Sequence, residues 1–184
     1  MKYREDASLY FIAVVPPEGI ATEINKIKED FAINYRSKYA LKAPPHITLH
    51  MPFWWKDDRA DELINFMQNF NMGKEAFKLQ LQNFNHFGKR VIYVDVEKNF
   101  YLNKLYNQLA GAIRKSLGIT NQAYKDRPFH PHMTVAFKDL RPGEFNNAWP
   151  VYADKKLHYE FKVDHTVLLK HDGQIWLPHS HFPF

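Results

Sequence analysis

The sequence contains no cysteine among its 184 residues, which excludes disulfide bonds, thiolate metal ligands and a cysteine nucleophile. It also has little that could enter a membrane. The apolar run at residues 9–15 is far shorter than the roughly 20 residues that a membrane-spanning helix needs. The run follows Glu5 and Asp6 and leads into two prolines, so it does not resemble a signal peptide. We therefore expect a cytoplasmic protein with no membrane partner.

The composition is that of a folded domain. Hydrophobic residues make up 45% of the chain and aromatic residues 16%, which is enough apolar material for a core and argues against disorder. The length suits a single domain over residues 1–184, built as two small lobes that share a core. The formal net charge of +5 favours polyanionic partners, among which phosphate esters and RNA are the obvious candidates.

Two copies of a short motif stand out in this chain. Residues 44–49 are PPHITL and residues 129–135 are FHPHMTV, so each copy has His-x-Thr-aliphatic just after a proline. Because strand side chains alternate between faces, His46 and Thr48 should point to one side of the first strand. His132 and Thr134 should do the same on the second. Two such strands side by side would place two imidazoles and two hydroxyls around one small cavity.

The elements around the two motifs follow the same order in both halves of the chain. In the first half, periodicity and turn residues predict a strand at 8–15, a helix at 18–37, a motif strand at 45–51 that Pro52 ends, a helix capped by Asp57 or Asp58, and a strand at 77–82. In the second half they predict a strand at 91–96, a helix at 100–117, a motif strand at 132–137, a short helix at 142–149, a strand at 157–163 that corresponds to 77–82, and a hairpin at 172–173 with a return strand at 174–177.

This order predicts an internal duplication, with repeats at approximately 8–87 and 90–173. The fold class that follows is α+β. We expect a duplicated, bilobal fold in which two antiparallel sheets line a central groove and the helices lie outside. A pseudo-twofold relation would place the two motif strands symmetrically about that groove.

The paired motifs, their separation and the duplicated layout resemble the two-histidine (2H) phosphoesterase superfamily, which includes the 2'-5' RNA ligase family and the RNA 2',3'-cyclic phosphodiesterases. The resemblance covers most of the chain. It implies a phosphodiesterase that acts on RNA ends or nucleotides, by opening 2',3'-cyclic phosphates or by cutting or joining 2'-5' linkages. Many members carry a basic residue in the pattern HxTLxR, whereas this chain has HMTVAFK, with Phe137 at that place and Lys138 next.

Cleavage of a phosphodiester requires one proton to be removed from the attacking oxygen and another to be delivered to the leaving oxygen. Two imidazoles can do both near neutral pH, so His46 and His132 are the predicted acid–base pair. Hydroxyl donors on the same strand faces would hold the phosphoryl oxygens as charge develops, which assigns Thr48 and Thr134. The scheme needs no metal or other cofactor, and it leaves open which histidine is the acid.

Four further residues are candidates for substrate binding. Lys138 follows Thr134 by four residues and should lie on the same strand face, and Arg127 is a second basic candidate. For both, a solvated surface position is an equally good interpretation. Tyr10 and Tyr124 could stack on a base, although packing in the core explains them better.

Two other functions fit parts of the sequence. A non-catalytic RNA-binding module could use the same groove, but it would have no need for the full set of two histidines and two threonines. A metal-dependent hydrolase could use the histidines at 171, 179 and 181, but no carboxylate is patterned with them. His50 and His130 also fall on the motif faces, and we expect them at the rim of the site. We expect a monomer whose substrate is an RNA end or a small nucleotide phosphodiester.

Overall fold

The computed structural model describes residues 4–120 and 128–184, and eight strands in these ranges form one sheet. Neighbouring strands pair antiparallel in the order β6-β3-β4-β5-β2-β1-β7-β8. The strands are β1 (Ala7–Val14), β2 (Ile47–Lys56), β3 (Phe77–Phe87), β4 (Val91–Val96), β5 (His132–Ala136), β6 (His158–Val163), β7 (His165–His171) and β8 (Trp176–Pro183).

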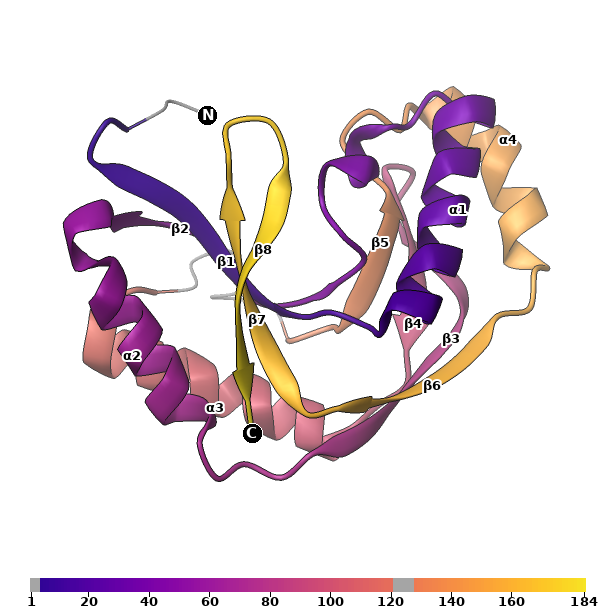
Figure 1. Ribbon diagram of the computed structural model, residues 1–184. Coiled ribbons are helices and arrows are strands. Elements are labelled where there is room, and N and C mark those ends of the chain that lie inside the picture. Colours follow the sequence, from indigo (N-terminus) through magenta and orange to yellow (C-terminus); the bar gives the residue numbers. More distant parts are fainter. Residues whose placement is uncertain (1–3, 121–127) are drawn as a thin grey trace.

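The two halves of the sheet meet at one pair of residues. Within the described chain, β2 and β5 are in register only at Ile47 and Met133, whereas the pairs on either side run along most of each strand. Figure 1 shows the resulting curl, with β1, β2, β7 and β8 on one side and β3 to β6 on the other. The α+β prediction is confirmed. The two predicted sheets are two halves of one sheet, because the motif strands bond to each other.

In the part of the chain that the structure describes, four helices cover the outside of this curl. They are α1 (Glu18–Asn34), α2 (Ala60–Asn71), α3 (Phe100–Leu117) and α4 (Pro142–Ala153), with two 3₁₀ turns, η1 (Tyr39–Lys42) and η2 (Asp57–Arg59). α1 packs on β5 and α4 on β3, whereas α3 packs on β2 and α2 on β8. Each motif strand is therefore covered by the helix of the opposite half of the chain. No helix in the described ranges has the length and hydropathy needed to cross a membrane.

The strand order is symmetric about the junction in part. β1 and β4 lie at equivalent places beside β2 and β5. β6, however, pairs with β3, and β7 holds the place that mirrors β3. The predicted correspondence of 157–163 with 77–82 is therefore wrong, because those two segments are neighbours in one half of the sheet. The duplication and its boundaries at 8–87 and 90–173 stay a prediction.

Two local expectations fail at the end of β2. The strand continues through Pro52, because Met51 and Pro52 together lie opposite Phe11 in a β-bulge, where the missing N–H of proline leaves no ladder bond unmade. Neither Asp57 nor Asp58 caps a helix. Both belong to η2, and the Asp57 carboxylate accepts a hydrogen bond of 2.6 Å from the Ser8 hydroxyl.

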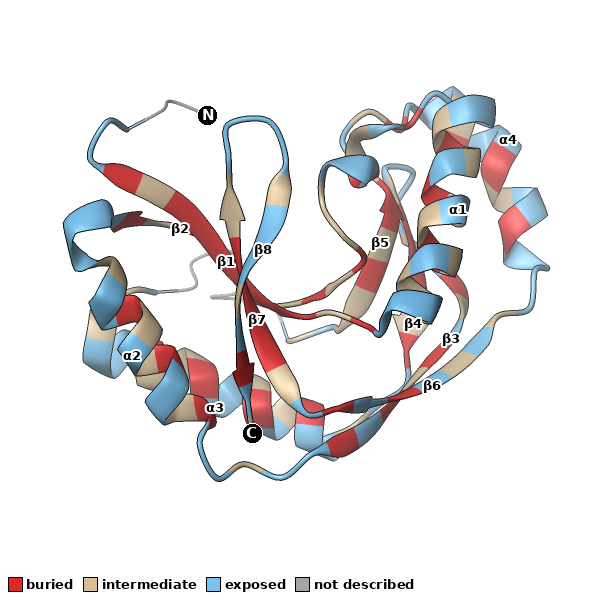
Figure 2. Cartoon of the chain, viewed as in Figure 1, coloured by how far each residue is buried: buried red, intermediate tan, exposed pale blue. Residues whose placement is uncertain are grey.

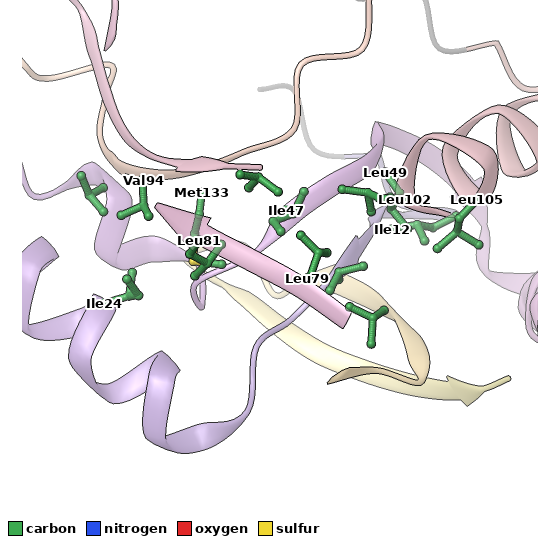
Figure 3. Packing of buried hydrophobic residues seen from close by; sticks show 14 of the residues in the cluster. Ile12, Ile24, Ile47, Leu49, Leu79, Leu81, Val94, Leu102, Leu105 and Met133 are labelled. Carbon is green, nitrogen blue, oxygen red and sulfur yellow. The ribbon is translucent and has the colours of Figure 1, made fainter. Parts of the chain in front are cut away.

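The main core lies between the helices and the convex side of the sheet. Figure 2 shows buried residues on the inner faces of the helices and along the central strands. Figure 3 shows Ile47 and Met133 among the packed side chains, together with Ile24 of α1 and Leu102 of α3. The aliphatic residues of both motifs are fully buried here, so the histidines and threonines that alternate with them face the other side.

A buried polar pair ties α2 to β7. Asn71 and Thr166 are both 0% exposed. The Thr166 hydroxyl donates to the Asn71 side-chain oxygen at 3.1 Å, and the Asn71 amide donates to the Met67 carbonyl at 2.7 Å. The Asn71 amide therefore provides the partner for the buried Thr166 hydroxyl.

We predict that Asn71→Ala lowers the free energy of unfolding by about 2 kcal/mol or more, because it leaves a buried hydroxyl unpaired and opens a small cavity. Asn69→Ala is the matched control, since Asn69 lies on the exposed side of the same helix. Urea denaturation of both variants measures the difference. Equal midpoints would show that the buried pair adds no stability.

Candidate active site

The junction of the sheet brings the two motifs together. Ile47 and Met133 are opposite each other in antiparallel strands, so His46 lies across from Thr134, and Thr48 across from His132. Residues directly opposite in such a pair have Cβ atoms about 5 Å apart, and diagonal ones about 7–8 Å. All four side chains are half-buried on one face. The arrangement is a compact square with an imidazole at two opposite corners and a hydroxyl at the other two.

Both histidines are held in the same way. Nδ1 of His46 is 2.7 Å from the carbonyl of Pro44, and Nδ1 of His132 is 2.7 Å from the carbonyl of His130. A carbonyl oxygen can only accept, so Nδ1 carries the proton and donates it. Nε2 of each neutral ring is then left with its lone pair free. Each motif therefore orients its own imidazole through the residue two places earlier, and this presents a nitrogen that can accept a proton.

Aromatic rings support the first histidine. The ring centroid of Phe11 lies 4.7 Å from that of His46, and the ring of Trp176 packs edge-on against Phe11 at 4.6 Å. Phe11 belongs to a small second cluster, separate from the main core. Tyr10, a candidate for stacking on a base, points into the main core and is 2% exposed, in line with the core packing that explained it better. The correction follows from alternation, because Phe11 is the β1 residue on the site face.

The second histidine has its own aromatic and polar neighbours. The rings of Tyr93 and Phe87 lie 5.1 and 5.0 Å from the ring of His132. The exposed His130 ring is 3.2 Å from the Tyr93 hydroxyl and 3.7 Å from the carboxylate of Asp95. His130 therefore lies beside the site, as predicted.

His50 does not. Its side chain is buried against Phe53. A second register shift in β2 leaves Leu49 as an extra residue between Thr48 and His50, and this breaks the alternation that would have placed His50 on the same face as His46.

The environments of the two imidazoles differ. The pKa of His46 is lowered to about 4, mainly by burial and to a smaller extent by the charges of Lys28 and His132, whereas the hydrogen bond to the Pro44 carbonyl opposes this shift. Burial also lowers the pKa of His132, but there the Asp95 carboxylate raises it along with the His130 carbonyl, and the His130 ring lowers it. The neutral form is therefore favoured most strongly at His46.

Of the remaining predicted substrate-binding residues, only Lys138 lies within the described part of the chain. Strand β5 ends at Ala136, and Lys138 has a left-handed φ of 60°, so strand alternation does not reach it. Its ammonium donates to the Tyr39 hydroxyl at 2.8 Å and lies over the Tyr39 ring. Arg127 and Tyr124 lie outside the described residues.

Lys28 of α1 is a neighbour of the site that sequence reasoning missed. It is 1% exposed between Ile24 and Phe31, and its Nζ donates to the carbonyl of Ala43 at 2.9 Å. The signal was present in the sequence, because Lys28 is a charged residue on the apolar stripe of a helix. Asp95 gave a similar signal as the one acidic residue within the apolar strand 91–96.

A cavity of about 610 Å³ lies beside the second motif. Amide and carboxylate side chains dominate its polar lining, and the aromatic ring of Phe129 also faces it. The polar lining residues are Gln82, Asn83, Asp95, Glu97, Lys98, Asn103 and His130. Gln82, Asp95 and His132 follow one another across the ladders of β3, β4 and β5. Neighbouring strands are about 4.8 Å apart, so the cavity begins within about 10 Å of the His132 position.

Among the described residues, no three histidine, aspartate or glutamate side chains are grouped so that they could hold a metal ion. In the C-terminal segment, the rings of His165 and His181 lie 5.2 Å apart, and Nδ1 of His165 is engaged by the carboxylate of Asp164.

Comparison with known proteins places these features in a family. The model of the 2'-5' RNA ligase superfamily matches residues 16–175. A protein of Geobacillus sp. (strain WCH70) that carries a provisional name as a phosphoesterase is 31% identical over 157 residues, which cover 82% of this chain and 86% of the relative. A similarly named protein of Bacillus mycoides (strain KBAB4) is 26% identical over 174 residues, which cover 93% and 94% of the two chains.

Solved structures share the fold at lower identity. Apo LigT of E. coli superposes with a TM-score of 0.70 at 16% identity, covering 98% of this chain and 99% of LigT. The PDE domain of MHV ns2 superposes with a TM-score of 0.55 at 16% identity, covering 89% and 99%. Because the family model spans most of the sequence, the chain belongs to the 2'-5' RNA ligase superfamily, the group of two-histidine phosphoesterases that its paired motifs resemble.

Proposed function

We propose that this phosphoesterase is a metal-independent phosphodiesterase that acts on RNA ends or nucleotides, by opening 2',3'-cyclic phosphates or by cutting or joining 2'-5' linkages. The observation that carries the proposal is the square of His46, Thr48, His132 and Thr134 at the strand junction. In it, each imidazole is fixed through Nδ1 and presents Nε2. Two proton-transfer groups on one half-buried face are what a phosphodiester needs on its attacking and leaving sides.

In the hydrolytic direction, a neutral imidazole takes a proton from water through Nε2 as the water oxygen attacks phosphorus. The bond from phosphorus to one ribose oxygen breaks, and the other imidazole, protonated at Nε2, donates its proton to that oxygen. The product is a phosphomonoester with a free hydroxyl. The two rings exchange protonation states, and solvent restores them. Thr48 and Thr134 donate hydrogen bonds to the non-bridging oxygens as their charge increases.

The surroundings of the two rings support one assignment of roles. His46 is the more deeply buried ring and has a cation, Lys28, as a neighbour, so its neutral form is favoured and it suits the proton acceptor. His132 has Asp95 nearby, which favours its charged form, so it suits the proton donor. In the reverse direction the roles exchange.

Three observations support a nucleotide or RNA substrate. The net charge of +5 favours a polyanion. The cavity beside His130 has amides and carboxylates that could bond to ribose hydroxyls and base amino groups, and its volume of about 610 Å³ is in the range of nucleoside-sized sites. Structures of the related fold in E. coli LigT have been determined with 3'-AMP, with ATP and with NADP+.

We predict that 2',3'-cyclic and 2'-5'-linked substrates are turned over in the presence of a chelator, and that His46→Ala or His132→Ala lowers kcat by ~10²–10⁴-fold. The double variant should lose little more than either single one, since the two rings act as a unit. Thr48→Ala and Thr134→Ala should lose less, because their hydroxyls only hold the phosphate.

The matched control is His181→Ala, which removes an exposed histidine of the C-terminal segment. It should keep the normal rate. A double His46→Ala, His132→Ala variant with near-normal turnover would disprove the proposal. Loss of rate in the control, together with sensitivity to chelator, would instead favour a metal-dependent hydrolase.

A second prediction concerns pH. kcat/KM should be bell-shaped, since His46 must be neutral and His132 protonated. The acidic limb should lie near the His46 pKa of about 4. The alkaline limb should lie below the ordinary histidine pKa of about 6.5, because burial lowers the pKa of His132. Initial rates from pH 3 to 9 at low substrate concentration measure both limbs. An optimum on the alkaline side of neutrality would contradict the role assignment.

A further inference from the structure

Lys28 is a buried cation without a buried anion. Its side chain is 1% exposed on the inner face of α1, and within the described residues its ammonium forms one hydrogen bond, to the carbonyl of Ala43, and no ion pair. Burial alone lowers its pKa, to about 7, and no carboxylate opposes this. A charged group placed this way is unfavourable for folding, and such groups cluster at functional sites.

Lys28 contacts the backbone directly before the residue that orients His46. Ala43 and Pro44 are consecutive residues. The carbonyl of Ala43 accepts from Lys28, and the carbonyl of Pro44 accepts from the ring of His46. Because Pro44 and Pro45 have no N–H, the backbone of these two residues can be anchored only through carbonyls. Lys28 therefore fixes the backbone one residue before the group that orients His46.

The second motif is anchored differently. The ring of His132 also donates to a carbonyl two residues earlier, but the residue there is His130, which is exposed and whose own ring contacts Tyr93 and Asp95. A buried cation therefore stands behind the first histidine, whereas a carboxylate stands near the second. The two halves of the square differ in electrostatics while sharing the same local geometry.

We propose that Lys28 is a positioning residue for His46, which holds the segment 43–46 through the Ala43 carbonyl and keeps the His46 imidazole neutral by its buried positive charge. The expected changes in reaction rate rest on the proposed function, whereas the expected change in the titration of His46 does not. The titratable groups that act on His46 in the described chain are Lys28 from α1 and His132 from β5. Only Lys28 is held by a hydrogen bond to the segment that precedes His46.

The charge also has a use when substrate binds. A phosphodiester carries a negative charge into a half-buried site, and a cation that has no anionic partner in the free protein stabilises that charge without first breaking an ion pair. In the free protein the same cation disfavours a second positive charge on His46. Both effects keep the first imidazole ready to accept a proton.

The experiment compares Lys28→Met, Lys28→Gln and the control Lys26→Met in the full chain. Lys26 is on the exposed side of the same helix and is paired with Glu23. Methionine keeps the apolar stem and removes charge and donor, whereas glutamine keeps an amide donor for the Ala43 carbonyl and removes only the charge. We measure thermal unfolding, the titration of the His46 ring by NMR, and the pH profile of kcat/KM on a 2',3'-cyclic mononucleotide.

Lys28→Met should unfold at the same temperature or higher, and its kcat should fall by roughly 10–100-fold, as expected when a reacting group is displaced slightly. The His46 ring should titrate at higher pH in both Lys28 variants, and the acidic limb of kcat/KM should move with it. Lys28→Gln should retain more of the rate than Lys28→Met. Lys26→Met should match the parent protein in all three measurements.

A folded Lys28→Met variant with the parent rate and an unchanged His46 titration would overturn the proposal. If Lys28→Met fails to fold, an unchanged His46 titration in Lys28→Gln would overturn it as well. The NMR measurement needs no turnover. A failure of the proposed phosphodiesterase activity would therefore appear as an inactive parent protein, and would be distinguished from a failure of the role assigned to Lys28.

Discussion

The pairing of Ile47 with Met133 is the contact on which the rest of the site depends. It is the only point in the described chain where the two four-stranded halves of the sheet are in register. Both side chains are fully buried in the common core. A shift of either motif strand by one residue at this point would turn that strand over and move its histidine into the core. Burial of two aliphatic residues therefore sets the position of four polar ones.

Each imidazole is likewise held in place by groups outside the square of four side chains. Proline precedes both histidines, and a carbonyl two residues earlier accepts the Nδ1 proton of each ring. This leaves Nε2 for chemistry and restricts the rotation of the ring. Aromatic neighbours complete the support, with Phe11 at His46 and both Tyr93 and Phe87 at His132. The repeated geometry orients the two imidazoles in the same way.

Electrostatics then makes the two similar groups unequal. Lys28 approaches His46 from α1, whereas Asp95 approaches the second motif from β4. The polar cavity also lies on the side of His130. On the proposed mechanism, a substrate would meet one side that favours a neutral imidazole and another that favours a charged one. The pseudo-symmetric frame therefore supports a reaction that needs an acid and a base at the same time.

The sequence by itself determined the local pattern of this protein. Alternation in PPHITL and FHPHMTV separated the polar face from the core, and period-3.6 spacing predicted the helices that became α1 and α3. These features depend on neighbours a few residues apart, so they could be predicted. The family could also be recognised, because its motifs are short and contiguous. Only the tertiary structure decided which distant segments meet. It placed Lys28 behind the first motif, put Phe11 rather than Tyr10 beside His46, turned Lys138 out of its strand, and set β6 beside β3. The physical reason is that strand pairing and helix docking depend on the burial of surfaces far apart in the chain, which local periodicity does not encode.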